Sequence, residues 1–141
     1  MSKISGLSHV AIAVPDIAVA AAALEKRLGI KAGPVHENTA QGVRLAYIDL
    51  GNARIELISP LSPGSHIAKF LERNPAGGLH HVAFNTPDLD AALSVAIGAG
   101  ARQAGKAGHN VHGERIAFLN PRELLGALVE LEEKTAVGNR Q

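Results

Sequence analysis

The chain has 141 residues, no cysteine and a formal net charge of +1, and 46% of its residues are hydrophobic. This length and composition are ordinary for one globular domain with a real core. Disulfides and thiolate metal sites are excluded, and a near-neutral chain without a Lys/Arg run gives no reason to expect nucleic acid. No apolar run approaches the roughly 20 residues of a membrane span. The first residues also lack a signal-peptide layout, so we expect a cytoplasmic protein without a membrane partner.

Residues 7–14, LSHVAIAV, alternate between two faces in the manner of a strand, with His9 on the face of small residues. A Pro-Asp pair ends this strand and caps an alanine-rich helix predicted over residues 17–28. Gly29 then ends the helix.

Residues 30–41 are polar and rich in turn formers, and they predict a loop. Two strands are predicted next, at residues 42–50 and 53–58, joined by a Gly-Asn hairpin turn. A serine then caps a short helix predicted over residues 66–73.

The second half of the chain repeats the first. Residues 79–88, LHHVAFNTPD, match residues 7–16, LSHVAIAVPD, at an offset of 72, as from position 9 to position 81. The stretches GVRLAYIDL and GERIAFLNP, which begin at Gly42 and Gly113, match at an offset of 71. Such self-similarity predicts two copies of one structural unit.

The remaining elements follow the same order after a flexible border at residues 74–78. They are a strand through His81, a helix over 89–97, a glycine-rich loop over 105–113, and strands over 113–121 and 128–131. We therefore predict an α+β fold with two tandem βαβββ modules, residues 7–73 and 79–133, in a single domain spanning residues 1–141.

The repeat selects four residues with metal-ligand chemistry. His9 aligns with His81, and Glu56 aligns with Glu130 at an offset of 74, as from 56 to 130. If the modules pack about a pseudo-twofold axis, the two pairs converge in a cleft within a curved mixed sheet. Two imidazoles and two carboxylates suit Co²⁺, Ni²⁺, Mn²⁺, Fe²⁺ or Zn²⁺ and leave positions for water or a chelating substrate. Taken singly, a strand histidine is more often a packed residue, so the prediction depends on all four.

The chain resembles the vicinal oxygen chelate (glyoxalase/bleomycin resistance/dioxygenase) superfamily and, within it, the methylmalonyl-CoA epimerase family. The resemblance spans about Leu7 to Glu133 and is carried by HVAIAVPD, QGVRLAYIDLGNARIELISPL, SHIAKFLERNPAGGLHHVAF, HGERIAFLNP and LVELEE. It implies that His9, Glu56, His81 and Glu130 bind a divalent metal ion, with Co²⁺ the first expectation and Ni²⁺, Mn²⁺ or Zn²⁺ next. It also implies an acyl-CoA substrate and a homodimer.

The reaction implied by the resemblance interconverts the C2 epimers of methylmalonyl-CoA or ethylmalonyl-CoA through proton abstraction and a metal-stabilised enolate. Glu130 is our candidate for one base. Some relatives carry a second catalytic Glu where this chain has Leu45, so the second acid–base group is unassigned. His112 is our candidate for it, with Glu37 and Asp49 as further candidates. The alternative for His112 is a loop histidine that caps backbone groups.

Two other functions stay open at this stage. A glyoxalase-type isomerase, like lactoylglutathione lyase, would use the same four ligands, and a metal-free small-molecule-binding protein would share the fold. A ring-cleaving dioxygenase is disfavoured because it uses three ligands and Glu56 supplies a fourth. His80 falls on the face opposite His81, which favours a structural role. No phosphate-binding loop motif is present, so CoA phosphates would meet scattered cations: Arg44, Lys69, Lys106 or Arg115.

Overall fold

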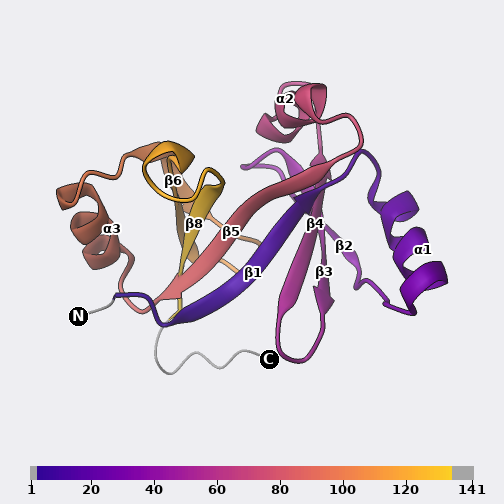
Figure 1. The fold of residues 1–141 in the computed structure, drawn as a ribbon, viewed down its shortest axis with the longest axis horizontal. Helices are drawn as coiled ribbons and strands as arrows, with labels where there is room; N and C mark the ends of the chain where they lie inside the picture. Colours follow the sequence, from indigo (N-terminus) through magenta and orange to yellow (C-terminus); the bar gives the residue numbers. More distant parts are fainter. Residues whose placement is uncertain (1–2, 135–141) are drawn as a thin grey trace. The chain divides into compact units, whose positions relative to one another are not determined.

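A computed structural model describes residues 3–134, which form two compact units. Residues 9–80 make the N-terminal unit, and residues 3–8 together with 81–134 make the C-terminal unit. The elements are, in chain order (Figure 1), β1 (Gly6–Ala13), α1 (Ile17–Leu28), β2 (Val35–Asn38), β3 (Val43–Asp49), β4 (Arg54–Pro60), α2 (His66–Arg73), β5 (Gly78–Thr86), α3 (Leu89–Gly98), β6 (Gln103–His109), β7 (Arg115–Leu119), the 3-10 turn η1 (Pro121–Glu123) and β8 (Leu128–Glu133).

Both units carry the same mixed four-stranded arrangement. The strand order is β2-β3-β4-β1 in the N-terminal unit and β6-β7-β8-β5 in the C-terminal unit. In each, the first and last strands of the module, β1 with β4 and β5 with β8, pair in parallel, while the other neighbours pair antiparallel. The predicted α+β fold of two βαβββ modules is confirmed.

The helices α1 and α2 begin and end where the sequence predicts, and α3 begins at the predicted residue and ends one residue later than expected. Asp16 and Asp88 cap α1 and α3 by accepting the backbone N–H three residues on, at 3.2 and 3.0 Å, and Ser65 does the same for α2. Gly29 adopts a left-handed φ of 70° and closes α1. Within residues 3–134, the helices are too short or too polar to cross a lipid bilayer.

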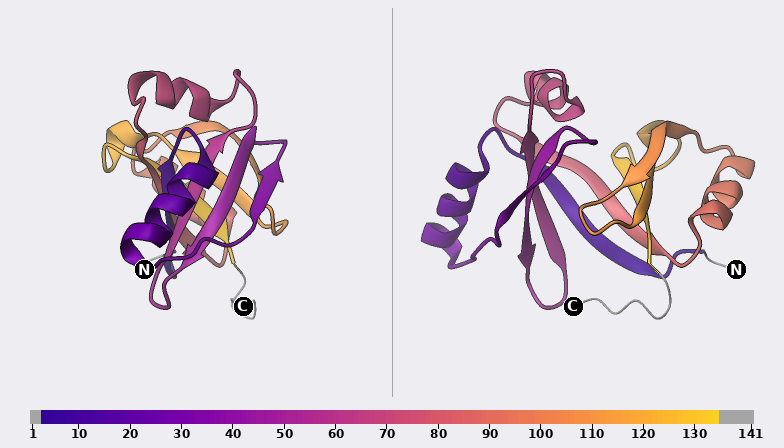
Figure 2. Two further views of the ribbon diagram at one scale, coloured as in Figure 1. Left: turned by 90° about the vertical axis from the view of Figure 1, so that its right-hand side faces the viewer. Right: turned by 180° about the vertical axis from the view of Figure 1, so that it is seen from behind.

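In Figure 2, α1 and α3 lie against the strands of their own units. The core of each unit lies between that helix and one face of its strands. In the N-terminal unit, α1 covers a buried cluster from β3, β4 and its own first turn: Ile17, Ala46, Ile48 and Leu57. In the C-terminal unit, α3 covers the equivalent cluster, which includes Leu89, Ala117, Leu119, Val129 and Leu131. Because strand side chains alternate, the residues between these core positions project from the opposite face of each sheet.

Two predicted loops contain strands. Residues 35–38, which we expected in a loop, form β2 and pair with β3 in antiparallel register. Residues 103–109, also expected to be mainly loop, form β6 against β7, with a register shift between Ala104 and Gly108. Both strands are largely exposed, so neither carries the hydrophobic alternation that identifies a half-buried strand.

Candidate functional site

The first candidate ligand pair lies within the N-terminal unit. His9 on β1 and Glu56 on β4 are 1% and 7% exposed, and their Nε2 and Oε1 atoms are 3.5 Å apart. The parallel register places Glu56 opposite Ala11, so both side chains project from the face that α1 does not cover. A carboxylate is rarely buried in a strand without a partner, and here the imidazole provides one.

The second pair repeats this geometry within the C-terminal unit. His81 on β5 and Glu130 on β8 are each 4% exposed, with Nε2 and Oε1 at 2.9 Å. Glu130 lies opposite Ala83, as Glu56 lies opposite Ala11. Each pair therefore forms within its own unit and is flanked by alanine on the neighbouring parallel strand.

An aromatic ring accompanies each pair, and the sequence reasoning missed both. Tyr47 lies directly across from Glu56 and contacts the His9 ring edge-on, with ring centres 6.4 Å apart. Phe118 lies directly across from Glu130 and meets His81 in the same way at 5.7 Å. These aromatics align at the repeat offset of 71 residues, from 47 to 118, so the repeat itself was the signal that could have found them.

His80 has the structural position expected of it. Its side chain alternates away from that of His81 along β5, and its ring packs edge-on against Phe70 of α2 at 5.1 Å.

The candidates for a second acid–base group lie in different surroundings. His112 is exposed on the loop between β6 and β7, where its backbone N–H donates to the side chain of Asn110. Glu37 and Asp49 are exposed and form ion pairs with Arg44 at 3.3 Å and Arg54 at 2.7 Å.

Leu45, by contrast, is buried, and its register partner on β2 is His36. That position therefore presents no acid–base side chain, and Leu45 itself belongs to the packed interior.

The cations considered for CoA phosphates differ in how far they are engaged. The Arg115 guanidinium holds Asp90 at 2.7 Å and lies 3.6 Å from Glu133, and the hydrogen bond and charge of Asp90 raise the pKa of Arg115. Arg44 is bound to Glu37, whereas Lys69 and Lys106 are simply exposed. Arg115 is thus occupied within the fold, which leaves the two lysines as the more available cations of that set.

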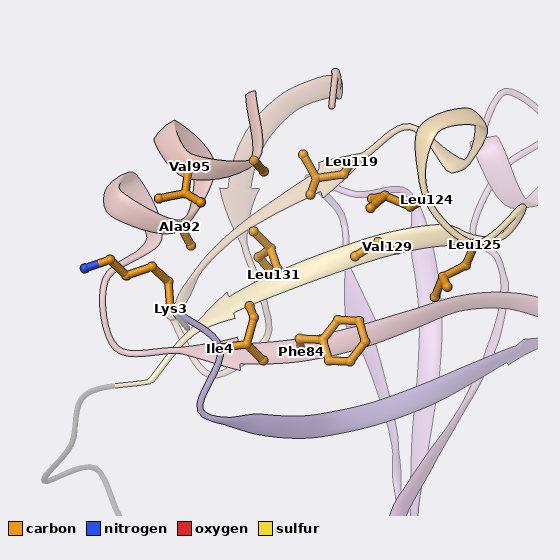
Figure 3. Close-up of a pocket in the computed structure, with 11 residues that line it drawn as sticks. Lys3, Ile4, Phe84, Ala92, Val95, Leu119, Leu124, Leu125, Val129 and Leu131 are labelled. Atoms are coloured by element: carbon orange, nitrogen blue, oxygen red, sulfur yellow. The ribbon is translucent and has the colours of Figure 1, made fainter. Parts of the chain in front are cut away.

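A cavity of about 440 Å³ lies in the C-terminal unit under α3 (Figure 3). Its walls are almost wholly apolar and include Phe84, Leu119, Val129 and Leu131, with Lys3 contributing the one charged side chain among the lining residues. Phe84 on β5 and Val129 and Leu131 on β8 alternate with His81 and Glu130 along these strands, so the cavity lies on the other face of the sheet. It contains none of the candidate ligands.

The two pairs have the donor chemistry of a divalent metal site. Neutral imidazole nitrogen and carboxylate oxygen are ligands that Co²⁺, Ni²⁺, Mn²⁺ and Zn²⁺ accept, and each pair supplies one of each from a buried position. Ala11 and Ala83, the register partners of Glu56 and Glu130, are small and leave room beside each carboxylate. The residues present therefore fit a divalent ion. Without one, each pair is a buried contact between an imidazole and a carboxylate, at 3.5 Å for His9 with Glu56 and 2.9 Å for His81 with Glu130.

Comparison with known proteins places this geometry in a family. The model of the glyoxalase/bleomycin resistance protein/dioxygenase superfamily matches residues 8–118. The chain belongs to this superfamily. Within it, the chain is 45% identical over 132 residues to the ethylmalonyl-CoA/methylmalonyl-CoA epimerase of Cereibacter sphaeroides, covering 92% of this chain and 98% of that one. It is 38% identical to the mitochondrial methylmalonyl-CoA epimerase of Homo sapiens, covering 90% of this chain and 73% of that one. This superfamily member therefore falls in the epimerase family.

Solved structures of superfamily members agree with the sequence comparison. The methylmalonyl-CoA epimerase of Mycobacterium tuberculosis superposes with a TM-score of 0.85 at 34% identity, over 96% of this chain and 91% of that one. A methylmalonyl-CoA epimerase in complex with methylmalonyl-CoA and NH₄⁺ superposes with a TM-score of 0.84 at 28% identity, over 97% and 99% of the two chains. The fold and family that the sequence predicted are confirmed.

Proposed function

We propose that the chain is an epimerase that interconverts the two C2 configurations of methylmalonyl-CoA or ethylmalonyl-CoA. The observation that carries the proposal is the pair of buried, repeat-related His–Glu contacts, His9 with Glu56 and His81 with Glu130. The proposal takes residues 7–73 and 79–133 as two modules of one functional domain. Its substrate class is supported by the similarity to epimerases of these two acyl-CoA thioesters.

We assign His9, Glu56, His81 and Glu130 as ligands of one divalent metal ion, Co²⁺ first, with Ni²⁺, Mn²⁺ and Zn²⁺ as alternatives. The support is the donor set, two imidazoles and two carboxylates, each from a buried and internally equivalent position. Such an ion, when bound, acts as a Lewis acid toward the carbonyl oxygens beside C2 and so acidifies the C2 proton.

The protein must also move a proton from one side of C2 to the other. We assign Glu130 as the group that removes the proton on one side, because its carboxylate is buried and held at 2.9 Å by His81. We assign His112 as the group that exchanges a proton on the other side, because an imidazole ring can both accept and donate a proton. Its exposed place on the β6–β7 loop leaves it accessible to substrate.

The decisive experiment is hydrogen exchange at C2 of methylmalonyl-CoA in D₂O, followed by mass spectrometry and chiral analysis. The purified protein is supplied with Co²⁺, then treated with chelator, then resupplied. We expect fast deuterium incorporation with racemisation in the presence of metal, loss with chelator, and recovery on readdition.

The same experiment separates the alternatives. Bound metal without C2 exchange would reject the epimerase and favour a glyoxalase-type isomerase, which is tested with the hemithioacetal of glutathione. A protein that binds no metal would favour a non-catalytic binding protein of this fold. The ethylmalonyl and methylmalonyl thioesters are compared in parallel, because the acyl preference is part of the proposal.

We further propose that the chain acts as a cytoplasmic homodimer. The support for the dimer is family resemblance alone, and light scattering coupled to size-exclusion chromatography tests it directly. A mass of one 14.6 kDa chain at micromolar concentration would contradict it.

A further inference from the structure

The loop that carries His112 is organised by a single asparagine. The side-chain Oδ1 of Asn110 accepts the backbone N–H groups of His112 at 2.9 Å and Glu114 at 3.0 Å. Its own backbone N–H donates to the carbonyl of Glu114, and its carbonyl accepts the N–H of Gly113. Gly113 has a φ of 80°, which the tight turn requires. Asn110 therefore fixes the backbone on both sides of His112.

The same asparagine attaches the loop to β8. Its Nδ2 donates to Glu114 Oε1 at 2.8 Å and to Glu132 Oε2 at 3.4 Å. Glu132 is 3% exposed and also accepts the Ser8 hydroxyl at 2.6 Å. The Lys134 ammonium binds Glu114 and lies 3.9 Å from Glu132. Buried carboxylates are stable only in such satisfied networks, so the attachment is specific.

This network connects the two residues to which we assign proton transfer. Glu132 follows Glu130 by two positions on β8, so both carboxylates project from the same face of the sheet. The antiparallel register confirms the row, with Ile116 opposite Glu132 and Phe118 opposite Glu130. One end of the network is thus the strand of the proposed base, and the other is the loop of the proposed acid.

We propose that Asn110 and Glu132 are positioning residues that hold the His112 loop in a fixed relation to the β8 strand bearing Glu130. The inference rests on the proposed function, since it assigns the loop a part in proton transfer. A short loop with an exposed histidine would otherwise sample many conformations, whereas proton transfer requires hydrogen-bond reach in the reacting complex. A displacement of about 1 Å can lower a rate on the order of 100-fold.

The first test compares Asn110→Ala with Asn120→Ala by epimerisation kinetics. Asn120 makes a matched local bond, accepting the backbone N–H of Arg122 at 2.9 Å at the start of η1. We expect Asn110→Ala to lower kcat by roughly 10- to 100-fold with KM little changed, and Asn120→Ala to retain the parental kcat. Glu132→Ala should lower kcat, and Glu132→Gln, which keeps an acceptor for Asn110, should recover part of it. Equal losses in the two asparagine variants would overturn the proposal.

A double variant distinguishes positioning from general structural damage. If Asn110 acts through His112, the variant Asn110→Ala/His112→Ala should be no slower than His112→Ala alone. A further loss equal to that seen in the His112-containing protein would show that Asn110 acts independently. Full activity of His112→Ala would also overturn the proposal, because the loop would then have no proton-transfer group to position.

Amide hydrogen exchange tests the positioning role of Asn110 independently of catalytic activity. In the substrate-free protein, Asn110→Ala should speed exchange at the His112 and Glu114 amides at least about tenfold, because both lose their acceptor. Amides of the Asn120 turn should be unchanged. Unchanged exchange at His112 would refute the positioning role even in an active enzyme. An inactive parent protein would instead reject the epimerase assignment, with the loop result still decided by exchange.

Discussion

Burying the carboxylates of Glu56 and Glu130 costs free energy, and the contacts with His9 and His81 offset part of that cost. A buried carboxylate such as Glu130 is unfavourable unless a polar partner such as an imidazole or a metal ion compensates for its lost hydration. His81 at 2.9 Å is therefore part of what keeps Glu130 in the fold as well as a proposed ligand. The two roles separate when one partner is replaced at a time.

We predict that His81→Ala abolishes metal binding and lowers the metal-free stability by about 3 kcal/mol, because Glu130 is left buried without its partner. Glu130→Gln should also lose metal affinity but cost less stability, since the amide oxygen still faces the imidazole. Urea unfolding with chelator and metal analysis by mass spectrometry measure both effects. Metal retention together with full activity in His81→Ala would reject the ligand assignment.

A second prediction concerns Glu114. Burial acts to raise the pKa of its carboxyl group, but hydrogen bonds from Lys134 and Asn110 outweigh burial and hold the pKa below the usual 4.5. A carboxyl with a lowered folded-state pKa stabilises the fold fully above its unfolded value and loses that contribution as the pH falls through the folded value. Glu114→Gln should therefore flatten the acid limb of stability below pH 4.5.

Denaturant unfolding from pH 3 to 7 measures this dependence, with Glu37→Gln as the control because Glu37 is an exposed carboxylate paired with Arg44. An unchanged acid limb in Glu114→Gln would contradict the assignment.

The sequence predicted the four candidate ligands because the repeat aligned them, and a repeat is visible without coordinates. It did not predict Asn110 with Glu132, because their contact depends on a loop conformation that brings together residues 22 positions apart. Tyr47 and Phe118 also align in the repeat, but aromatic residues are common in strands, so the alignment alone did not mark them as part of the site.

Whole elements were predictable where their signals are local. The Asp16 and Ser65 caps, the Gly29 stop and the bounds of α1 and α2 depend on neighbouring residues alone and were predicted correctly. The strands β2 and β6 were missed because they are exposed, and β6, QAGKAGH, contains two glycines. Their strand conformation comes from pairing with β3 and β7, which a local pattern does not contain.

Gly77, just before β5, passes too close to the end of β1 for any side chain to fit. Its φ is 92°, and an added Cβ would lie closer to the carbonyl oxygen of Ala13, at the end of β1, than real contacts allow. Gly100 has a similarly positive φ of 103° but open space around its Cβ position. Gly100→Ala should therefore cost about 1–2 kcal/mol from backbone strain alone, and Gly77→Ala clearly more. Thermal and urea unfolding compare the two, and equal losses would show that the close approach at Gly77 is unimportant.

On the scale of the whole molecule, the proposed metal takes one ligand pair from each compact unit. A ligand that binds only the folded protein stabilises it by about 2.7 kcal/mol at a concentration 100 times its Kd. We predict that Co²⁺ slows amide hydrogen exchange in the strands of both units together. His81 belongs to the C-terminal unit, but replacing it with Ala should also remove the Co²⁺-dependent slowing of amide exchange in the N-terminal unit. Slowing confined to one unit would contradict a shared ion.

The first described residues of the chain belong with its last strands. The Ser5 N–H donates to the carbonyl of Asn85, and the Ser8 hydroxyl donates to Glu132, 124 positions away. Such contacts between distant residues slow folding, because a long loop must close before they form. During synthesis, residues 9–80 leave the ribosome before β8 has been made. The C-terminal unit must wait for β8, because the acceptor of the Ser8 hydroxyl, Glu132, lies on that strand. In the interval in which β5 has been made but not β8, β5 lacks its parallel partner, and an unpaired strand edge of this kind favours misassembly.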